Sequence, residues 1–205
     1  MKTLLPFLSL IVFISFSGLA QKPELSYNKF TGEVTQTRVV DMGKDQLVVF
    51  RNVRTWLTQK YSNYWEIIKV SDADRGRIVY QGSESVYTPG YDAFSYRVTV
   101  DIKDNQYSCT IDQVKTKQSG VKAFESSDTD FSTIHTYRRR IADIDVAKML
   151  RKGKAEQSRL NRERWSKTTY LENLAKMHDI MAYQFDRIQI ELRNAALKSD
   201  PMVRR

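Results

Sequence analysis

The sequence predicts an α+β fold, in which an antiparallel sheet carries one helix across a face and is followed by a C-terminal helical extension. Three observations predict this fold class. The stretch 96–111 alternates apolar and polar residues on both sides of an Asp-Asn pair, as a β-hairpin does. The stretch 44–61 repeats apolar residues with a helical period. One predicted strand precedes this helix and four follow it, an order typical of an antiparallel sheet covered by a single helix.

The first 20 residues have the pattern of a secretory signal peptide. A basic residue at position 2 precedes an apolar run over 4–16, and the small residues Gly18 and Ala20 suit a cleavage site. The run is too short to span a bilayer comfortably, and an uncleaved membrane anchor is the alternative. We therefore expect residues 1–20 to be a signal peptide that is cleaved after Ala20, which places the protein in the periplasm or outside the cell.

Composition adds limits on compartment and stability. The chain has 205 residues, a net charge of +9 and one cysteine. This length suits one domain with an extension. Because the cysteine lies far from Gln21, we expect no lipoprotein. A lone cysteine cannot form an internal disulfide, so Cys109 is expected to be a small buried residue on a strand, with a reactive thiol as the alternative.

The strand and helix before the first hairpin follow from two changes of pattern. Val and Thr residues mixed with charges over 32–42 predict a half-buried strand, which Gly43 ends. Over 44–61, Val49, Val53 and Trp56 fall on one helical stripe. We expect an amphipathic helix in which Trp56 is a core anchor, because large aromatic side chains in such a stripe usually fill the interface between helix and sheet.

Two hairpins are expected after this helix. The segments 65–70 and 77–82 are rich in β-branched and aromatic residues and are joined by a turn-rich stretch that ends at Gly76. The second hairpin turns at Asp104 and Asn105, residue types that tolerate the positive φ angle of a tight turn.

These segments together carry a resemblance to a known family. The stretches 32–34, 49–63, 74–83 and 96–111 are similar to the exported bacterial family called domain of unknown function 4468, described as having a TBP-like fold. The similarity covers about residues 30–116. Its most telling parts are the helix ending in Trp56-Leu57 and the turn IKDNQY, where the family more often has KDG before the aromatic residue. The resemblance implies a helix-on-sheet module in secreted or envelope-associated proteins of Gram-negative bacteria, and it implies neither a catalytic residue nor a substrate.

The chain after the module changes character. With the module at 21–116, the polar stretch 117–137 predicts a linker and 138–205 predict a basic helical tail. A short helix is expected over 141–150, near a break at Gly153. From position 171 onward, apolar residues recur at steps of three and four, a seam made of Leu171, Leu174, His178, Met181, Phe185, Ile188, Leu192 and Ala195.

Two interpretations of the seam remain open. In the first, the helix packs its apolar stripe on the module or on the preceding helix, as most amphipathic helices of globular chains do. In the second, residues 171–195 pair with a second copy or another protein as a coiled coil, which makes a homodimer possible.

Basic residues are concentrated in the tail. The candidates for binding an anionic partner are Arg138, Arg139, Arg140, Arg151, Lys152, Lys154, Arg159, Arg162 and Arg164. Most such runs are solvated helix faces, which is the alternative interpretation. Outside the cytoplasm the abundant polyanions are lipid phosphates, lipopolysaccharide, acidic glycans and acidic faces of envelope proteins, so nucleic acid is an unlikely partner there. A TBP-like fold does not by itself imply DNA binding.

The sequence names no catalytic site. It lacks a G-x-S-x-G motif, a P-loop and a G-x-G-x-x-G motif. His135 and His178 do not have metal-ligand spacing, so we expect neither a metal nor a cofactor. No spacing selects a pair of carboxylates for hydrolysis. We expect an exported, non-enzymatic envelope protein that binds or scaffolds. The alternative is an assembly factor acting through its C-terminal helix, and nucleic-acid binding or a hydrolase comes after it.

Overall fold

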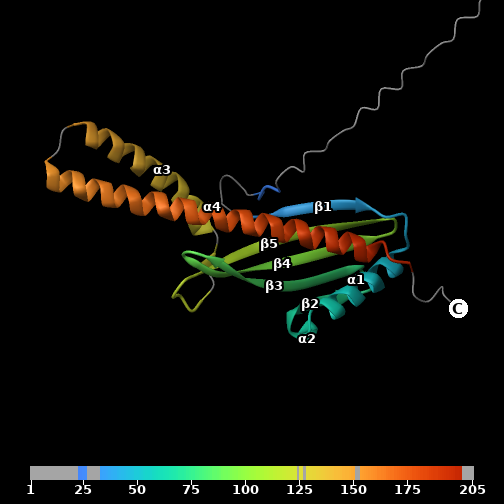
Figure 1. Ribbon diagram of the computed structural model, residues 1–205. Helices are drawn as coiled ribbons and strands as arrows, with labels where there is room; N and C mark the ends of the chain where they lie inside the picture. Colours follow the sequence, from blue (N-terminus) through green and yellow to red (C-terminus); the bar gives the residue numbers. More distant parts are fainter. Residues whose placement is uncertain (1–22, 27–32, 124, 127, 151–152, 200–205) are drawn as a thin grey trace, which may run out of the picture.

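The computed structural model describes residues 23–26, 33–123, 125–126, 128–150 and 153–199, so the predicted signal peptide lies outside the described residues. Figure 1 shows one sheet, a short helix against it, and a long helix that crosses it and continues past its edge. In chain order the elements are β1 (Gln36–Asp41), α1 (Gln46–Lys60), α2 (Tyr64–Ile67), β2 (Ile68–Asp72), β3 (Arg77–Thr88), β4 (Tyr91–Lys103), β5 (Gln106–Gln118), β6 (Glu125–Ser126), α3 (Asp128–Met149) and α4 (Lys154–Ala196).

The sheet is antiparallel throughout. Its strands follow the order β1-β5-β4-β3-β2, and the two-residue β6 pairs with β5. The β4–β5 hairpin turns where predicted, and Asn105 has a φ of 66°. The side chain of Asp104 accepts a hydrogen bond from the backbone N–H of Gln46 (3.1 Å), which ties this turn to the start of α1. The predicted α+β class, with a helix on the sheet and C-terminal helices, is therefore confirmed.

Helix α1 begins at a side-chain cap and buries one stripe. The Asp45 carboxylate accepts hydrogen bonds from the backbone N–H groups of Leu47 (2.8 Å) and Val48 (3.4 Å), which satisfies two otherwise unpaired donors. Val53 and Leu57, one turn apart, are fully buried. Trp56 lies beside this stripe and is only partly buried, so the prediction that it is the core anchor is wrong. Leu57 takes the position that faces the sheet.

The segment 65–70 is not one strand as predicted. Residues 64–67 form the single-turn helix α2, in which Tyr64 is buried and Trp65 is exposed, and β2 begins only at Ile68. A buried tyrosine followed by an exposed tryptophan gives the same alternation of buried and exposed side chains as a strand does, so the sequence pattern does not separate the two structures here. The turn after β2, which ends at Gly76, forms as predicted.

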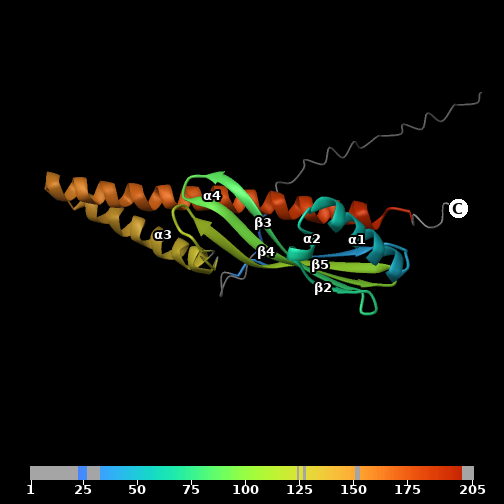
Figure 2. The same cartoon turned by 90° about the horizontal axis from the view of Figure 1, so that it is seen from below.

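Helix α4 supplies part of the hydrophobic core. Figure 2 shows α1 and α4 on the same side of the sheet. The predicted seam faces the strands, and its buried members include Leu174, Met181, Phe185, Ile188 and Leu192. The first interpretation of the seam therefore describes this chain. A homodimer through 171–195 stays a prediction, and it would have to use a stripe that already contacts the sheet.

Helix α1 and the residues just before it also hold the end of α4. The Lys44 ammonium donates hydrogen bonds to the carbonyl oxygens of Leu197 (2.6 Å) and Lys198 (2.7 Å). The side-chain amide of the buried Asn52 donates to the Lys198 carbonyl (2.8 Å). These donors satisfy carbonyl groups that a helix leaves unpaired at its C-terminus.

The helices of the tail are longer than predicted. Helix α3 begins at Asp128, inside the stretch 117–137 expected as a linker, and continues to Met149. Helix α4 then runs for 43 residues, from Lys154 to Ala196. Its first half pairs with α3 as an antiparallel hairpin, which buries Ile144 and Leu160. None of the helices described is both long and apolar enough to cross a membrane.

Candidate functional site

The predicted basic residues lie on a helical arm. We use this name for α3 together with residues 154–170 of α4, which extend beyond the sheet in Figures 1 and 2. Arg138, Arg139 and Arg140 belong to α3, whereas Lys154, Arg159, Arg162 and Arg164 belong to α4. Arg151 and Lys152 lie outside the described residues.

Three of these cations are engaged within the arm. Arg140 donates two hydrogen bonds to Glu163 (2.8 and 3.1 Å), and Arg164 donates two to Asp145 (2.8 and 3.4 Å). Both pairs join α3 to α4. The hydrogen bond from Arg140 lowers the pKa of Glu163, and that from Arg164 lowers the pKa of Asp145. Arg159 pairs with Glu156 one turn away (2.8 Å). These three arginines therefore help to hold the arm together.

Four others have no such role. Arg138, Arg139, Lys154 and Arg162 are exposed, and within the described part of the chain none of them forms an ion pair. Their charge is available to a partner. The described members of the predicted basic set all lie on the arm, and their binding to an anionic partner stays a prediction. The residue types alone could not separate these four from the paired three.

The end of the arm is also apolar. Val146, Met149 and Leu150 expose 59%, 79% and 69% of their surface. Their spacing places them on one face of the last turns of α3. Exposed apolar groups gathered in one place mark a contact surface more often than isolated ones do.

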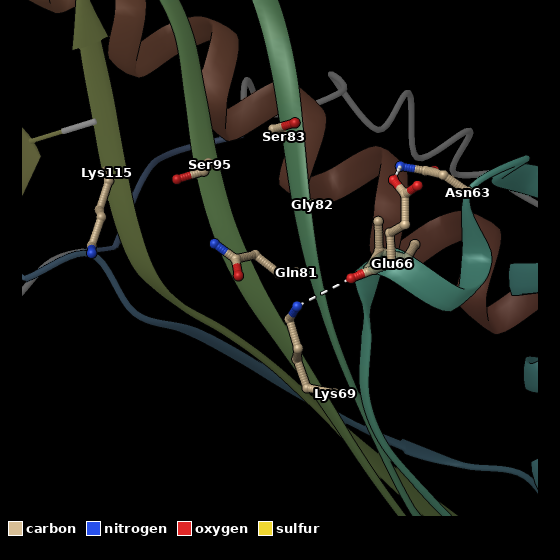
Figure 3. A pocket seen from close by; sticks show the side chains of 9 residues that line it. Asn63, Glu66, Lys69, Gln81, Gly82, Ser83, Ser95 and Lys115 are labelled. Atoms are coloured by element: carbon tan, nitrogen blue, oxygen red, sulfur yellow. Dashed lines mark hydrogen bonds between the residues drawn. The ribbon is translucent and has the colours of Figure 1, made fainter. Parts of the chain in front are cut away.

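A second surface lies on the open face of the sheet, opposite α1 and α4. Two adjoining hollows of about 640 and 420 Å³ share Lys69, Gln81 and Lys115 as lining residues. We call the two together the sheet trough. In Figure 3, Lys115 of β5 lies on one side, and Asn63 and Glu66 lie on the other. The residue pattern of the strands does not indicate this surface.

The comparisons with known proteins agree with this architecture. Residues 35–117 match the model of the family described as a domain of unknown function (DUF4468) with TBP-like fold. The chain contains a DUF4468 domain. The resemblance predicted from the sequence is thereby confirmed. No curated protein matches the chain.

Two solved structures are similar to the chain. A DUF4468 family protein from Bacteroides ovatus ATCC 8483 is 14% identical, covers 86% of this chain and 92% of its own, and superposes with a TM-score of 0.55. A TBP-like protein from Parabacteroides distasonis ATCC 8503 is also 14% identical, covers 50% of this chain and 69% of its own, and gives a TM-score of 0.42. The first likeness extends beyond the segment matched by the DUF4468 model, and at this identity it concerns the fold alone.

The thiol of the DUF4468 domain is buried in the sheet. Cys109 lies on β5 with 1% of its surface exposed, as the simpler of the two sequence interpretations predicts. Burial raises the pKa of its thiol to about 12, although the Arg38 guanidinium acts in the opposite direction. A thiol that stays protonated is a poor nucleophile.

Both histidines border one hollow between α3 and α4. His135 of α3 and His178 of α4 line a space of about 180 Å³, together with Arg138 and apolar side chains. Their separation in the sequence gave no indication of this proximity. Among the described residues, no group of three or more His, Cys, Asp or Glu side chains is arranged to hold a metal ion.

The partly buried His178 is expected to make stability depend on pH. Burial lowers its pKa from 6.5 to about 4, and Asp179 acts in the opposite direction. The unfolded chain therefore binds a proton that the folded chain does not, and stability is lost as pH falls from about 6.5 toward 4. The loss attributable to this group is at most about 3 kcal/mol.

Urea unfolding of the wild type and of His178→Gln across this pH window measures the effect. As pH falls, the unfolding free energy of the wild type should decrease more than that of the variant, because only the wild type has this imidazole to protonate. Parallel pH profiles for the two proteins would contradict the assignment. Arg138 and His135, which share the hollow, are present in both proteins, so their contributions cancel when the two pH profiles are compared.

Proposed function

We propose that this protein is an exported, non-enzymatic component of the bacterial envelope that binds anionic membrane surfaces through its arm. The observation that carries the proposal is the combination of an apolar end on the arm with four exposed cations that form no ion pair with any described residue. The DUF4468 domain then acts as the scaffold from which the arm extends. The leader-like pattern over 1–20 is the reason for assigning the envelope.

The charges account for attraction to an anionic bilayer. A Lys or Arg near such a surface contributes about 1 kcal/mol, and the contribution falls off within a Debye length. Arg138, Arg139, Lys154 and Arg162 thus supply about 4 kcal/mol together if all four reach the lipid phosphates. The paired arginines contribute less, because their carboxylate partners already neutralise them.

The apolar end favours a lipid surface over a soluble polyanion. Met149, the last residue of α3, and Leu150, which follows it, are mostly exposed, so burying them in the headgroup region removes apolar surface from water. A polysaccharide or the acidic face of a protein would contact the cations and leave these side chains in water. Membrane binding therefore uses both features of the arm.

Co-sedimentation with vesicles tests the proposal. Vesicles of phosphatidylcholine with phosphatidylglycerol should bind the protein, and vesicles of phosphatidylcholine alone should bind it far less. Replacing Arg138, Arg139, Lys154 and Arg162 by Gln should weaken binding by about a hundredfold or more at low salt. The matched control replaces four exposed basic residues outside the arm, and these are Arg54, Lys103, Lys122 and Lys176.

The control has the same net charge as the arm variant, so it separates local contact from overall charge. Equal loss of binding in both variants would contradict a role for the arm. The proposal would also be contradicted if binding by the wild type did not change between about 50 and 300 mM salt, because salt screens the attraction between the arm cations and the lipid phosphates. Replacing Met149 and Leu150 by Ser should remove the part of the binding that survives high salt.

A further inference from the structure

The sheet trough presents cations to solvent on a polar surface. Arg77 is paired with Asp101 (2.6 Å) and Arg97 with Asp112 (2.8 Å), so these four charges cancel locally. Two further cations line the trough. Lys69 donates a hydrogen bond to the backbone carbonyl of Glu66 (3.1 Å) and forms no ion pair with any described residue. The Glu66 carboxylate also lines the trough, and it accepts a hydrogen bond from the Asn63 side chain (3.4 Å). Lys115 forms no ion pair within the described part of the chain.

A bulge in β5 directs Lys115 into the trough. Ile111 and Val114 are both buried although they are three positions apart, an odd spacing, so the regular alternation of the strand is interrupted between them. The interruption is at Gln113, a non-glycine residue with a φ of 49°, and the register of β4 with β5 shifts at the same place. Without the extra residue, Lys115 would face the core. Strained residues of this kind are common beside binding sites.

The two ammonium groups lie on different strands. Lys69 belongs to β2 and Lys115 to β5, with β3 and β4 between them. Three strand spacings put their backbones about 14 Å apart across the sheet. The two lysines are also offset along the strands, because Lys115 lies at the level of Ser83 whereas Lys69 lies at the level of Tyr80, so their full separation is larger. A small anion contacts one of these lysines, whereas an extended ligand with repeated negative charges contacts both. Figure 3 shows Gln81, Ser83 and Ser95 in the space between the two sides.

The surface between the cations suits a hydroxyl-rich ligand. Gln81, Ser83, Ser95 and Thr99 supply amide and hydroxyl groups that both donate and accept hydrogen bonds. The lining residues of both hollows include no aromatic side chain on which a nucleic-acid base could stack.

We propose that the sheet trough binds a linear acidic oligosaccharide, whose carboxylates contact Lys69 and Lys115 and whose hydroxyl groups contact the polar residues between them. This site is separate from the membrane-binding arm and does not depend on it. The two lysines favour an acidic saccharide over a neutral one, because their charges are complementary to carboxylates. The distance between them favours an oligosaccharide over a monosaccharide, because only a chain of several sugar units contacts both.

Isothermal titration calorimetry with tetragalacturonate as the probe tests this site on the whole protein, with the arm included. Tetragalacturonate should bind roughly tenfold or more tightly than the monosaccharide galacturonate or the neutral maltotetraose. Its binding should weaken as salt is added. The double variant Lys69→Gln and Lys115→Gln should lose most of this affinity. The matched control, Lys103→Gln with Lys122→Gln, changes two exposed lysines outside the trough and should bind as the wild type does.

The four-residue arm variant described above allows the two proposals to be tested separately. If tetragalacturonate binds the trough, the arm variant keeps its affinity, even though it no longer binds vesicles. Absence of tetragalacturonate binding by the wild type would overturn the proposal, as would full affinity in the trough variant. Equal affinity for a four-nucleotide oligothymidine would overturn the saccharide assignment, and equal affinity for the monomer would overturn the requirement for two lysines.

Discussion

Phe185→Ala is expected to lower the free energy of unfolding by about 4 kcal/mol, because truncation of a fully buried Phe removes apolar burial and leaves a cavity. Phe185 lies on α4 with 0% of its surface exposed. Its ring meets the rings of Phe94 and Tyr96 edge to face, with centroids 6.0 and 5.5 Å away. These contacts join α4 to the centre of the sheet, and each edge-to-face pair adds about 1 kcal/mol beyond area burial.

Thermal and urea unfolding measure this effect. For a chain of this length, 4 kcal/mol corresponds to a fall in Tm of about 12 °C. Tyr183→Ala is the control, because Tyr183 lies on the same helix with 55% of its surface exposed. It should change the unfolding free energy by about 0.5 kcal/mol or less. A similar small change in Phe185→Ala would show that α4 does not form part of the core in solution.

The sequence predicted the elements whose stabilising contacts are local. The Asp104-Asn105 hairpin formed as expected, because alternation and turn chemistry both lie within sixteen residues. Helix α1 also formed as expected, with Asp45 as a cap that the helix start requires. The prediction that Trp56 is the anchor was wrong, because a wide apolar face on a helix does not specify which of its members faces the sheet.

Features that depend on contacts between distant residues could not be read from the pattern. The seam on α4 was recognised, but a buried stripe and a coiled-coil stripe have the same spacing, and only the packing of Phe185 against β4 decides between them. The described basic candidates lie together on the arm, yet their pattern could not show which of them are paired, because the ion pair of Arg164 with Asp145 joins two helices. The trough was missed because Lys115 faces it only through the bulge at Gln113.

Gly76→Ala is expected to destabilise the protein by about 3 kcal/mol or more, through a clash and backbone strain acting together. Gly76 has a φ of 63°, a conformation that costs any other residue about 1 kcal/mol. A Cβ atom there would meet the backbone oxygen of Ile102 and the side chain of Gln46 at 2.9 Å. The Ile102 backbone cannot move away freely, because its N–H donates a hydrogen bond to the Gly76 carbonyl (2.7 Å).

Gly43→Ala separates the clash from the strain. Gly43 has nearly the same φ, 59°, but a Cβ atom there has no neighbour within 4 Å, so its substitution reports the cost of backbone conformation alone. The Gly76 variant should therefore lose about 2 kcal/mol more than the Gly43 variant in urea unfolding. Equal losses would mean that the turn after β2 does not pack against Ile102 and Gln46. The excess loss measures how tightly this turn is held between the start of α1 and the end of β4.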